Sequence, residues 1–390
     1  MSLAAALPGL EVVGQSVVRL ARPHPGFLFG SGKIKELHQQ LKANDAELVL
    51  IDGPLTPVQQ RNLEKEWGVK ILDRTGLILE IFSDRARTRE GVLQVEMAAL
   101  SYQRTRLVRA WTHLERQRGG LGFVGGPGET QIEADRRAID DQLTRIKRQL
   151  AKVVKTRELH RAARAKVPFP VVALVGYTNA GKSTLFNHMT GAEVMAEDML
   201  FATLDPTMRG VELPSGQNVI LSDTVGFISD LPTQLVASFR ATLEEVLGAN
   251  LIVHVRDISH PESAKQAADV EAILKELGVP RETTRIEVWN KTDLLDEDER
   301  HARETEAERR DGVFTISALT GAGIDTLLDA IEGALVEPHL NETLHLGFGE
   351  GRKRAWLFDH GVVEGEDQGE DGWHIAVTWT QRQKQEYAAF

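Results

Sequence analysis

Residues 176–183 read Gly-Tyr-Thr-Asn-Ala-Gly-Lys-Ser and follow directly on the apolar run Val171–Val175. They match the G-x-x-x-x-G-K-[ST] pattern of a phosphate-binding loop, which lies between a buried strand and the start of a helix. The glycines let backbone amides curve around a phosphate, and the helix N-terminus adds the positive end of its dipole. This stretch therefore predicts an α/β domain that binds a nucleotide. The phosphate loop comprises Gly176, Tyr177, Thr178, Asn179, Ala180, Gly181, Lys182 and Ser183.

Side chains in and after this loop predict how the phosphates and a metal ion are held. Lys182 is expected to neutralise charge on the β- and γ-phosphates, and the Ser183 hydroxyl to ligate Mg²⁺. Asp223-Thr224-Val225-Gly226 follows another apolar run. Its aspartate is expected to hold Mg²⁺ through water, and the Gly226 amide to meet the γ-phosphate.

A further motif predicts that the base is guanine. Asn290-Lys291-Thr292-Asp293 follows the apolar run that ends at Trp289. The Asp293 carboxylate can accept hydrogen bonds from both N1–H and N2–H₂ of guanine, a pair that adenine lacks, and losing such a matched pair sets specificity. Lys291 is expected to lie across the base plane. Ser317-Ala318-Leu319 is expected to present a backbone amide to guanine O6.

The residues that complete the reaction site are less well determined by the pattern. Within Phe201-Ala202-Thr203-Leu204-Asp205, Thr203 is the best candidate for the threonine that ligates Mg²⁺ and contacts the γ-phosphate, and Thr207 is its rival. Lys182, Thr203 and Gly226 are the expected catalytic groups. Ras-like GTPases carry a water-orienting glutamine after the corresponding glycine. Here that residue is Phe227, so we expect slow intrinsic hydrolysis that a partner stimulates.

Apolar runs alternating with helical stretches extend this domain over residues 167–338 and predict a mostly parallel sheet covered by helices. The expected strands are Val171–Val175, Val219–Leu221, Leu251–Val255, Ile286–Trp289 and Val313–Ile316.

The part of the chain before this domain predicts two further modules. Residues 1–90 contain short buried strands at Glu47–Asp52 and Val69–Asp73 and a helix start at Thr56, which suit a small α/β unit. Residues 91–166 carry two apolar stripes with alternating spacings of four and three residues, which predict a long antiparallel helical hairpin. Its tip would be 119–128, where six glycines and a proline cannot continue a helix. The stripes consist of Leu93, Met97, Leu100, Leu107, Trp111 and Leu114, and of Ile139, Leu143, Ile146, Leu150 and Val153.

Residues 339–390 predict a small C-terminal domain that contains β structure. Strand-like runs occur around Ala355–Phe358 and His374–Thr380, and between them Glu364–Gly372 is expected to form an acidic, glycine-rich loop. The overall expectation is an α/β P-loop GTPase domain preceded by an α/β domain with a helical hairpin and followed by this small domain.

The composition restricts the possible cellular compartment and the kinds of metal site. The chain has no cysteine, which excludes disulfides and cysteine–zinc sites. No run approaches the roughly 18 apolar residues that a membrane helix needs, so we expect a cytoplasmic protein without a membrane span. Gly30-Ser31-Gly32-Lys33 resembles a second phosphate loop, but the positions that need Gly and Ser/Thr are Phe27 and Ile34. It is predicted to be a turn and a helix start.

Charge is distributed unevenly along the chain, whose net charge is −11. Residues 104–166 carry 16 Lys/Arg and 7 Asp/Glu, whereas residues 167–390 carry 18 and 38. A basic segment in an acidic protein is a candidate contact for a polyanion such as RNA. A solvated helix face is an equally valid interpretation of the charge alone.

The motifs together resemble those of the HflX-type GTPases of the Obg–HflX-like group. The resemblance rests on GYTNAGKS at 176–183, LFATLDPT at 200–207, DTVGF at 223–227 and NKTD at 290–293. The upstream run GGPGETQIEADRR at 125–137 is the more discriminating one, and the resemblance covers about residues 1–337.

That resemblance implies a monomeric GTPase that uses Mg²⁺ and GTP or GDP, binds the large (50S) ribosomal subunit and splits stalled or stressed ribosomes, with rRNA meeting residues 104–166. Two alternatives remain open. One is a nucleotide-switched factor that remodels structured RNA, with ATP as an optional second nucleotide. The other is a GTP-gated adaptor that recruits a protein through the acidic C-terminal region, in which case deletion of 341–390 would abolish function but spare ribosome association.

Overall fold

The computed structural model describes most of the chain, which forms two compact units, Met1–Leu328 and Asp329–Phe390. Most of the predicted glycine-rich tip lies outside the described residues. The described residues are 4, 7, 9–117, 127–164, 169–192, 201, 203–204, 206–228, 245–280, 282–336, 339–369 and 371–390, and for 108–117, 127–132, 154, 156–164, 339, 381, 382 and 389 only the backbone is described.

The first unit begins with two short parallel strands and the helices around them, as predicted. Helix α3 (Pro57–Trp67) starts after Thr56, whose side chain accepts from the Gln59 amide while the Gln59 side chain accepts from the Thr56 amide. This reciprocal capping satisfies two amides that the helix itself leaves unpaired. A helix also starts at Ser31, so Gly30–Lys33 is a helix start as predicted. The elements are α2 (Ser31–Ala43), β1 (Leu48–Ile51), α3 (Pro57–Trp67), β2 (Lys70–Asp73) and α4 (Arg74–Arg85).

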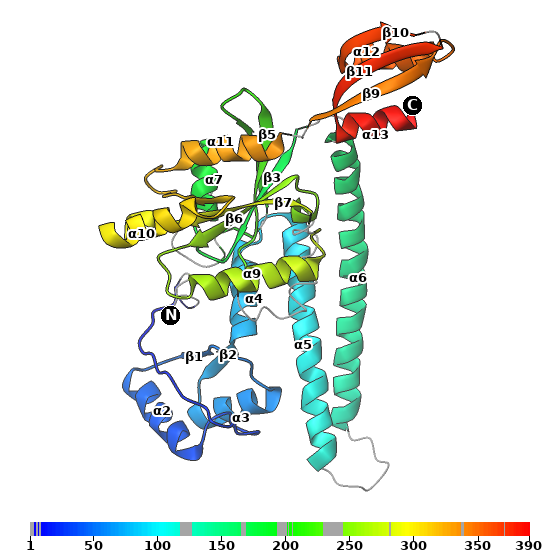
Figure 1. Cartoon of the computed structure of the whole chain (residues 1–390). Coiled ribbons are helices and arrows are strands. Elements are labelled where there is room, and N and C mark those ends of the chain that lie inside the picture. Colours follow the sequence, from blue (N-terminus) through cyan, green and yellow to red (C-terminus); the bar gives the residue numbers. More distant parts are fainter. Residues whose placement is uncertain are drawn as a thin grey trace. The chain divides into compact units, whose positions relative to one another are not determined.

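Two long helices follow and lie side by side as an antiparallel pair, α5 (Arg89–Gln117) and α6 (Pro127–Arg164) (Figure 1). Their contact is the predicted one, because Leu93 of α5 packs with Ile146 and Leu150 of α6 in one apolar cluster. Side chains spaced four and three residues apart fall on one face of a helix, which explains why the two stripes meet.

The nucleotide-binding part of the first unit is built on a six-stranded sheet in the order β4-β5-β3-β6-β7-β8. Neighbouring strands are parallel except β4 and β5, which pair antiparallel. The five predicted strands are confirmed, and β4 at the sheet edge is an additional strand. The strands are β3 (Val171–Gly176), β4 (Thr207–Glu212), β5 (Asn218–Asp223), β6 (Leu251–Asp257), β7 (Thr284–Asn290) and β8 (Val313–Thr315).

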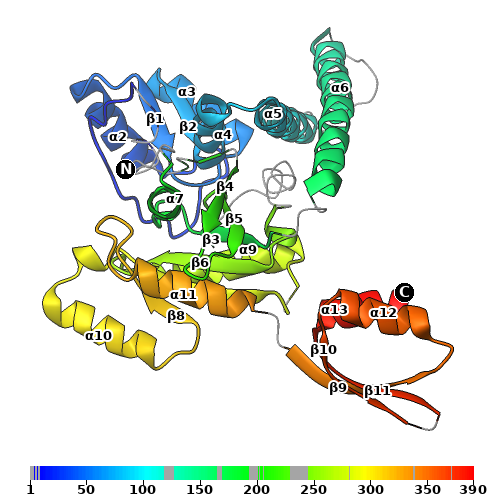
Figure 2. The ribbon, with the colours of Figure 1, turned by 90° about the horizontal axis from the view of Figure 1, so that it is seen from above.

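Helices cover this sheet, as Figures 1 and 2 show. One face packs on α9, whose Val270 and Leu274 join Val175 and Ile252 in a buried cluster. Residues at alternate positions point to the opposite face, and Leu174 there is fully buried, so both faces are covered. The helices are α7 (Lys182–Thr190), the 3-10 turn η1 (Thr292–Leu294), α9 (Ser263–Leu277), α10 (Glu297–Glu308) and α11 (Ile324–Leu335).

The second unit contains a three-stranded antiparallel sheet in the order β10-β11-β9. Its own core includes Leu346, Leu357, Ile375 and Trp379. Its elements are β9 (His339–Gly347), α12 (Gly351–Asp359), β10 (Val363–Gln368), β11 (Gly372–Thr380) and α13 (Gln381–Ala389).

Two predictions in this unit are wrong. Ala355–Phe358 lies in α12 and not in a strand. It forms a helix in which Trp356 and Leu357 are buried and Trp356 stacks on His360, one helical turn later. Most of Glu364–Gly372 is strand β10 and not a loop. This strand is polar because it lies at the sheet edge, where pairing with β11 supplies its order.

No helix among the described residues is long and apolar enough to cross a membrane.

Candidate nucleotide site

The phosphate loop lies between β3 and α7, as the motif requires. Gly181 has φ +92°, and a Cβ added there would lie 2.1 Å from Asn290 Nδ2. Only glycine fits this position, because its backbone is left-handed and the space is taken. Lys182 Nζ donates to the carbonyls of Tyr177 (3.0 Å) and Gly176 (3.3 Å). These bonds hold the ammonium inside the loop, where a phosphate would meet it.

Three oxygen-bearing side chains meet beside the loop. Ser183 Oγ lies 2.8 Å from Asp223 Oδ2 and 2.8 Å from Thr203 Oγ1, and Thr203 Oγ1 lies 2.8 Å from Asp223 Oδ2. Adjacent ligands of an octahedral Mg²⁺, each at about 2.1 Å, would be about 3.0 Å apart. The two hydroxyls therefore have nearly the spacing of neighbouring Mg²⁺ ligands. Thr207, the rival candidate, begins β4 and lies opposite Asp223 in the antiparallel pairing with β5, whereas the Thr203 hydroxyl donates to Asp223 Oδ2.

Burial tunes the charged groups of this cluster. Burial lowers the pKa of Lys182 to about 8, against the charge of Asp223, which raises it. Burial raises the pKa of Asp223, against Lys182 and the hydroxyls of Thr203 and Ser183, which lower it. Asp223 Oδ1 is buried and has no hydrogen-bond partner among the described residues. A cation or its bound water would satisfy this oxygen, so the donor set fits a hard divalent ion.

The Asp223–Phe227 segment lies directly on the phosphate loop. The Thr178 amide donates to the Phe227 carbonyl (2.7 Å), and the Phe227 amide donates to the Gly176 carbonyl (3.0 Å). A Cβ added at Gly226 would meet Thr178 Cα at 2.8 Å and Lys182 Nζ at 3.2 Å. Glycine at this position lets the segment approach the loop and the lysine this closely.

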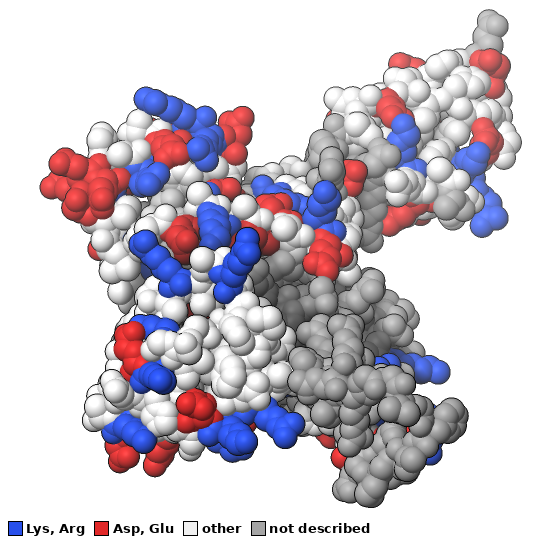
Figure 3. Space-filling model, turned by 90° about the horizontal axis from the view of Figure 1, so that it is seen from below, with Lys and Arg blue, Asp and Glu red and all other residues white. Residues whose placement is uncertain are grey.

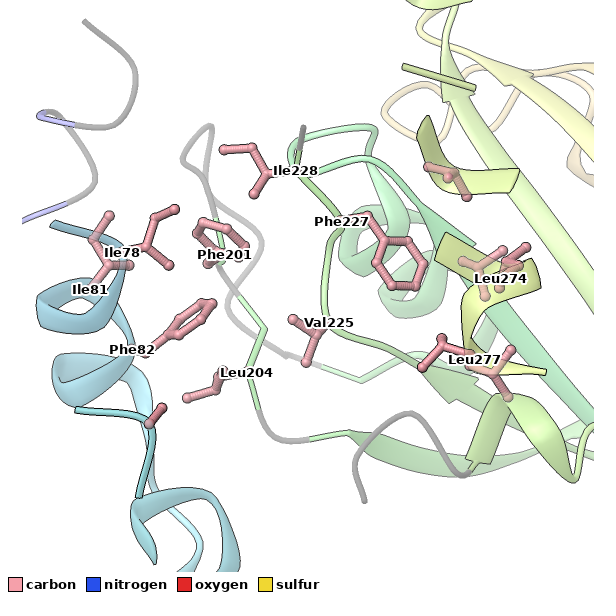
Figure 4. Close-up of a cluster of buried hydrophobic side chains, with 14 of the residues drawn as sticks. Ile78, Ile81, Phe82, Phe201, Leu204, Val225, Phe227, Ile228, Leu274 and Leu277 are labelled. Atoms are coloured by element: carbon pink, nitrogen blue, oxygen red, sulfur yellow. The ribbon is translucent and has the colours of Figure 1, made fainter. Parts of the chain in front are cut away.

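The residues around Thr203 are held by an apolar contact that the motif does not reveal. Phe201 has φ +57° and is almost fully buried, and its ring meets that of Phe82 on α4 at 4.7 Å, edge to face. Figure 4 shows Phe201 on the side of α4, whereas Phe227 lies on the side of Leu274 and Leu277. Phe227 therefore belongs to the core beside α9. Ala202 and Asp205 of the predicted segment lie outside the described residues.

The base end of the site is assembled from three loops. Asn290 Nδ2 donates to the Ala180 carbonyl (2.8 Å), and Asn290 Oδ1 accepts from the Ala318 amide (2.9 Å). The Ser317 hydroxyl donates to Asp293 Oδ1 (2.6 Å), which orients that exposed carboxylate. Because Ala318 already donates to Asn290, a bond from that amide to guanine O6 would replace or share this one.

Two contributors were missed from the sequence. Lys291, itself at φ +66°, pairs through Nζ with Asp257 Oδ2 at 2.9 Å. Asp257 ends β6, and its place at the carboxyl edge of a parallel sheet was a signal that could have been used. The contact of Phe82 with Phe201 has no local signal, because it joins two modules that lie far apart in the chain. Among the described residues no group of three or more His, Cys, Asp or Glu could hold a metal ion.

Comparison with known proteins gives matches along the chain. Four family models match, described as GTP-binding GTPase N-terminal (residues 1–83), GTP-binding GTPase Middle Region (85–164), 50S ribosome-binding GTPase (171–291) and HflX C-terminal domain (302–388). A GTPase HflX of Magnetococcus marinus is 50% identical over 363 residues, which are 93% of this chain and 83% of that protein. The GTPase HflX of Escherichia coli is 46% identical over 350 residues, which are 90% of this chain and 82% of that protein.

A solved structure is also similar. The GTP-binding protein of Sulfolobus solfataricus in complex with GDP is 22% identical to this chain, with a TM-score of 0.43, over 80% of this chain and 88% of that one.

A sheet of this order with a phosphate loop after β3 and a guanine-selective motif after β7 defines the P-loop GTPases, which hydrolyse GTP to GDP and phosphate. Within that class, the chain shares 46–50% sequence identity with two HflX GTPases over at least nine-tenths of its length. The protein therefore belongs to the HflX family of GTPases.

Proposed function

We propose that this GTPase binds the large ribosomal subunit, splits stalled or stressed ribosomes, and hydrolyses GTP faster on the ribosome than alone. The observation that carries the proposal is a group of three basic side chains on α6. Arg145, Lys147 and Arg148 are exposed, whereas Ile146 and Leu150 face α5. The description of the family model that matches 171–291, a 50S ribosome-binding GTPase, supports the same partner. The protein would work as a single chain in the cytoplasm.

Electrostatics favours α6 as the contact with rRNA. Lysine and arginine side chains that neutralise phosphates release counterions, which drives binding and makes it sensitive to salt. On the face of the molecule shown in Figure 3, basic and acidic side chains alternate over the described surface. With a net charge of −11, the protein as a whole repels RNA, so attraction has to come from a local basic surface.

We propose Mg²⁺ as the ion held beside the phosphates, with Ser183 and Thr203 as protein ligands and Asp223 acting through bound water. Mg²⁺ supplies charge stabilisation for the phosphates. The remaining work falls to this chain: Lys182 and the Gly226 amide bind the γ-phosphate, while Asp293, oriented by Ser317, selects guanine.

The nucleotide state would reach the N-terminal module through α4. Phe82, Ile78 and Ile81 of α4 share one buried cluster with Phe201 and Leu204, which flank Thr203. A change at Thr203 when the γ-phosphate leaves would therefore alter the packing of α4. Tight cores respond to such shifts by repacking, so the contact can convert hydrolysis into a change in ribosome affinity.

The first experiment measures GTP turnover with and without purified 50S subunits. We expect stimulation of at least about tenfold, because Phe227 supplies no water-orienting group. Asp293→Asn serves as the specificity control and should lose GTP binding, since the amide cannot accept both guanine donors. Turnover that 50S subunits leave unchanged would exclude the ribosomal function while leaving the GTPase assignment intact.

A second experiment tests the three basic side chains of α6 directly. Changing Arg145, Lys147 and Arg148 to Glu should weaken co-sedimentation with 50S subunits by about tenfold or more and reduce its salt dependence, with GDP affinity unchanged. The matched control changes three exposed arginines in and directly after α10 to Glu and should bind like the wild type. These are Arg300, Arg303 and Arg309.

A basic helix also suits free structured RNA, which keeps the RNA-remodelling function as the alternative. That function predicts comparable affinity for protein-free RNA hairpins and for 50S subunits, together with strand separation in the absence of ribosomes. A preference for intact subunits of a hundredfold or more would decide against it.

A further inference from the structure

Hydrolysis requires a group that orients the attacking water, and the usual position for it is taken by Phe227. That side chain is only 2% exposed and packs in the cluster of Leu274 and Leu277 (Figure 4). It has no polar atom with which to hold water. The orienting group must therefore come from another residue beside the γ-phosphate or from a partner.

Thr178 in the phosphate loop carries a hydroxyl that has no role in the site described above. The residue is 5% exposed, and its Oγ1 is buried with no hydrogen-bond partner among the described residues. Leaving a buried hydroxyl unpaired costs free energy, and valine would fill the same space without that cost. An unpaired hydroxyl at such a site is expected where it acquires a partner in another state of the protein.

The surroundings of Thr178 are those of the γ-phosphate. A Cβ added at Gly226 would meet both Cα and Cγ2 of Thr178 at 2.8 Å and Lys182 Nζ at 3.2 Å. The Thr178 amide is fixed by its bond to the Phe227 carbonyl at 2.7 Å. Lys182 and the Gly226 amide are the groups predicted to meet the γ-phosphate. The Thr178 side chain thus lies beside both of these groups, with its Cγ2 methyl on the side of Gly226.

We propose that the Thr178 hydroxyl is a catalytic group that orients the attacking water. It accepts a hydrogen bond from the water and donates its own hydrogen to a γ-phosphate oxygen. The water oxygen bonds to the γ-phosphorus as the bond to the β–γ bridging oxygen breaks, and that electron pair stays on GDP. The proton lost by the water ends on the released phosphate, and Thr178 neither gains nor loses a proton.

In the present arrangement, Gly226 occupies the space next to Thr178 and Lys182. On this proposal, the Asp223–Phe227 segment shifts when the γ-phosphate enters, so that the Gly226 amide and the Thr178 hydroxyl both face the phosphate. The hydroxyl gains its hydrogen-bond partner on that phosphate. Its lack of a partner here and its role in the GTP complex follow from the same geometry.

The test compares Thr178→Val, which keeps the shape but removes the hydroxyl, with Thr178→Ser, which keeps the hydroxyl. Single-turnover GTP hydrolysis is measured on the isolated full chain, together with affinity for GDP and for GDP with aluminium fluoride. We expect Thr178→Val to hydrolyse GTP about tenfold to a hundredfold more slowly and to lose a similar factor in affinity for the aluminium fluoride complex. GDP affinity should stay within about twofold, and Thr178→Ser should keep most of the rate.

Wild-type hydrolysis by Thr178→Val would overturn the proposal. The proposal would also be overturned if both variants lost hydrolysis rate and GDP affinity together. That result would mean that the substitutions disturb the packing of the loop, and that loss of the hydroxyl is not the cause. No ribosome is present in this assay, so its outcome is independent of the ribosomal function proposed above.

Discussion

At the scale of single residues, the backbone of Phe201 in the nucleotide site is stabilised by packing against Phe82 of α4. A bulky side chain at φ +57° is disfavoured. Burial of its ring against Phe82 provides a compensating gain, since an aromatic side chain buries a large apolar area. Two positions later, Thr203 lies next to Asp223 and Ser183. The unusual backbone at Phe201 is therefore part of how the hydroxyl of Thr203 is positioned.

The two candidate threonines can be separated by substitution. Thr203→Ala should weaken GTP binding in Mg²⁺ by about tenfold or more and slow hydrolysis, because a hydroxyl is lost from the cluster that fits the ion. Thr207→Ala should leave both nearly unchanged, since alanine keeps the backbone pairing between β4 and β5. Calorimetric titration of each variant with a non-hydrolysable GTP analogue, with and without Mg²⁺, measures this. Equal defects in the two variants would contradict the placement.

At the scale of elements, α4 is the helix that joins the N-terminal module to the nucleotide site. Its N-cap is Asp73, whose carboxylate accepts from the Gly76 amide (2.8 Å), the Tyr102 hydroxyl (2.6 Å) and Arg106 (3.2 Å). Tyr102 and Arg106 belong to α5, so one buried carboxylate connects β2, α4 and the hairpin. Burial, together with Asp73, raises the pKa of Tyr102, so its phenol stays protonated as a donor.

Phe82→Ala tests whether α4 supports the segment around Thr203. Removing this ring should destabilise the first unit by about 3–5 kcal/mol and speed the dissociation of Mg²⁺·GTP about tenfold, with little effect on GDP. Stopped-flow release of labelled nucleotides would measure the two rates.

Leu63→Ala on α3 is the control for that prediction. Leu63 is fully buried, but in the separate cluster beneath β1 and β2. It should lower stability without changing the ratio of GTP to GDP dissociation rates. If both variants changed that ratio equally, general destabilisation would explain the effect of Phe82→Ala.

At the scale of the whole molecule, stability depends on a histidine buried in the central sheet. Burial lowers the pKa of His254 on β6 to about 4 from 6.5, and the neighbouring Glu287 only partly opposes this. The unfolded chain takes up a proton below pH 6.5, whereas the folded chain does not until about pH 4. The unfolded state binds more protons in this window, so stability falls as the pH drops through it.

Urea unfolding at pH 7.5 and pH 5.0 measures this contribution. Wild-type protein should lose about 2 kcal/mol more between the two values than His254→Gln, since each pH unit in the window is worth about 1.4 kcal/mol. The amide has similar polarity but does not titrate. An equal loss in both proteins would show that other groups govern the acid sensitivity.

Local pattern was sufficient for much of the architecture. Each of the five predicted strands is a short apolar run, and each stripe of the hairpin is a repeat along one helix. Both patterns are therefore visible in residues that are close together in the sequence. The pattern was insufficient in the second unit. There the apolar run at Trp356 and Leu357 belongs to a helix, and the polar β10 is ordered by pairing with β11.

From its sequence alone, this protein is determined to be a P-loop GTPase, because loop geometry and base selection depend on a few residue types at set spacings in Gly176–Ser183 and Asn290–Asp293. The resemblance to the HflX type depends chiefly on the upstream run at 125–137. Only the tertiary structure decided which threonine hydroxyl lies beside Asp223, that Phe227 joins the core next to α9, and that Phe82 supports Phe201. These contacts join residues from separate elements, and their partners are chosen by packing in three dimensions, which spacing along the chain does not encode.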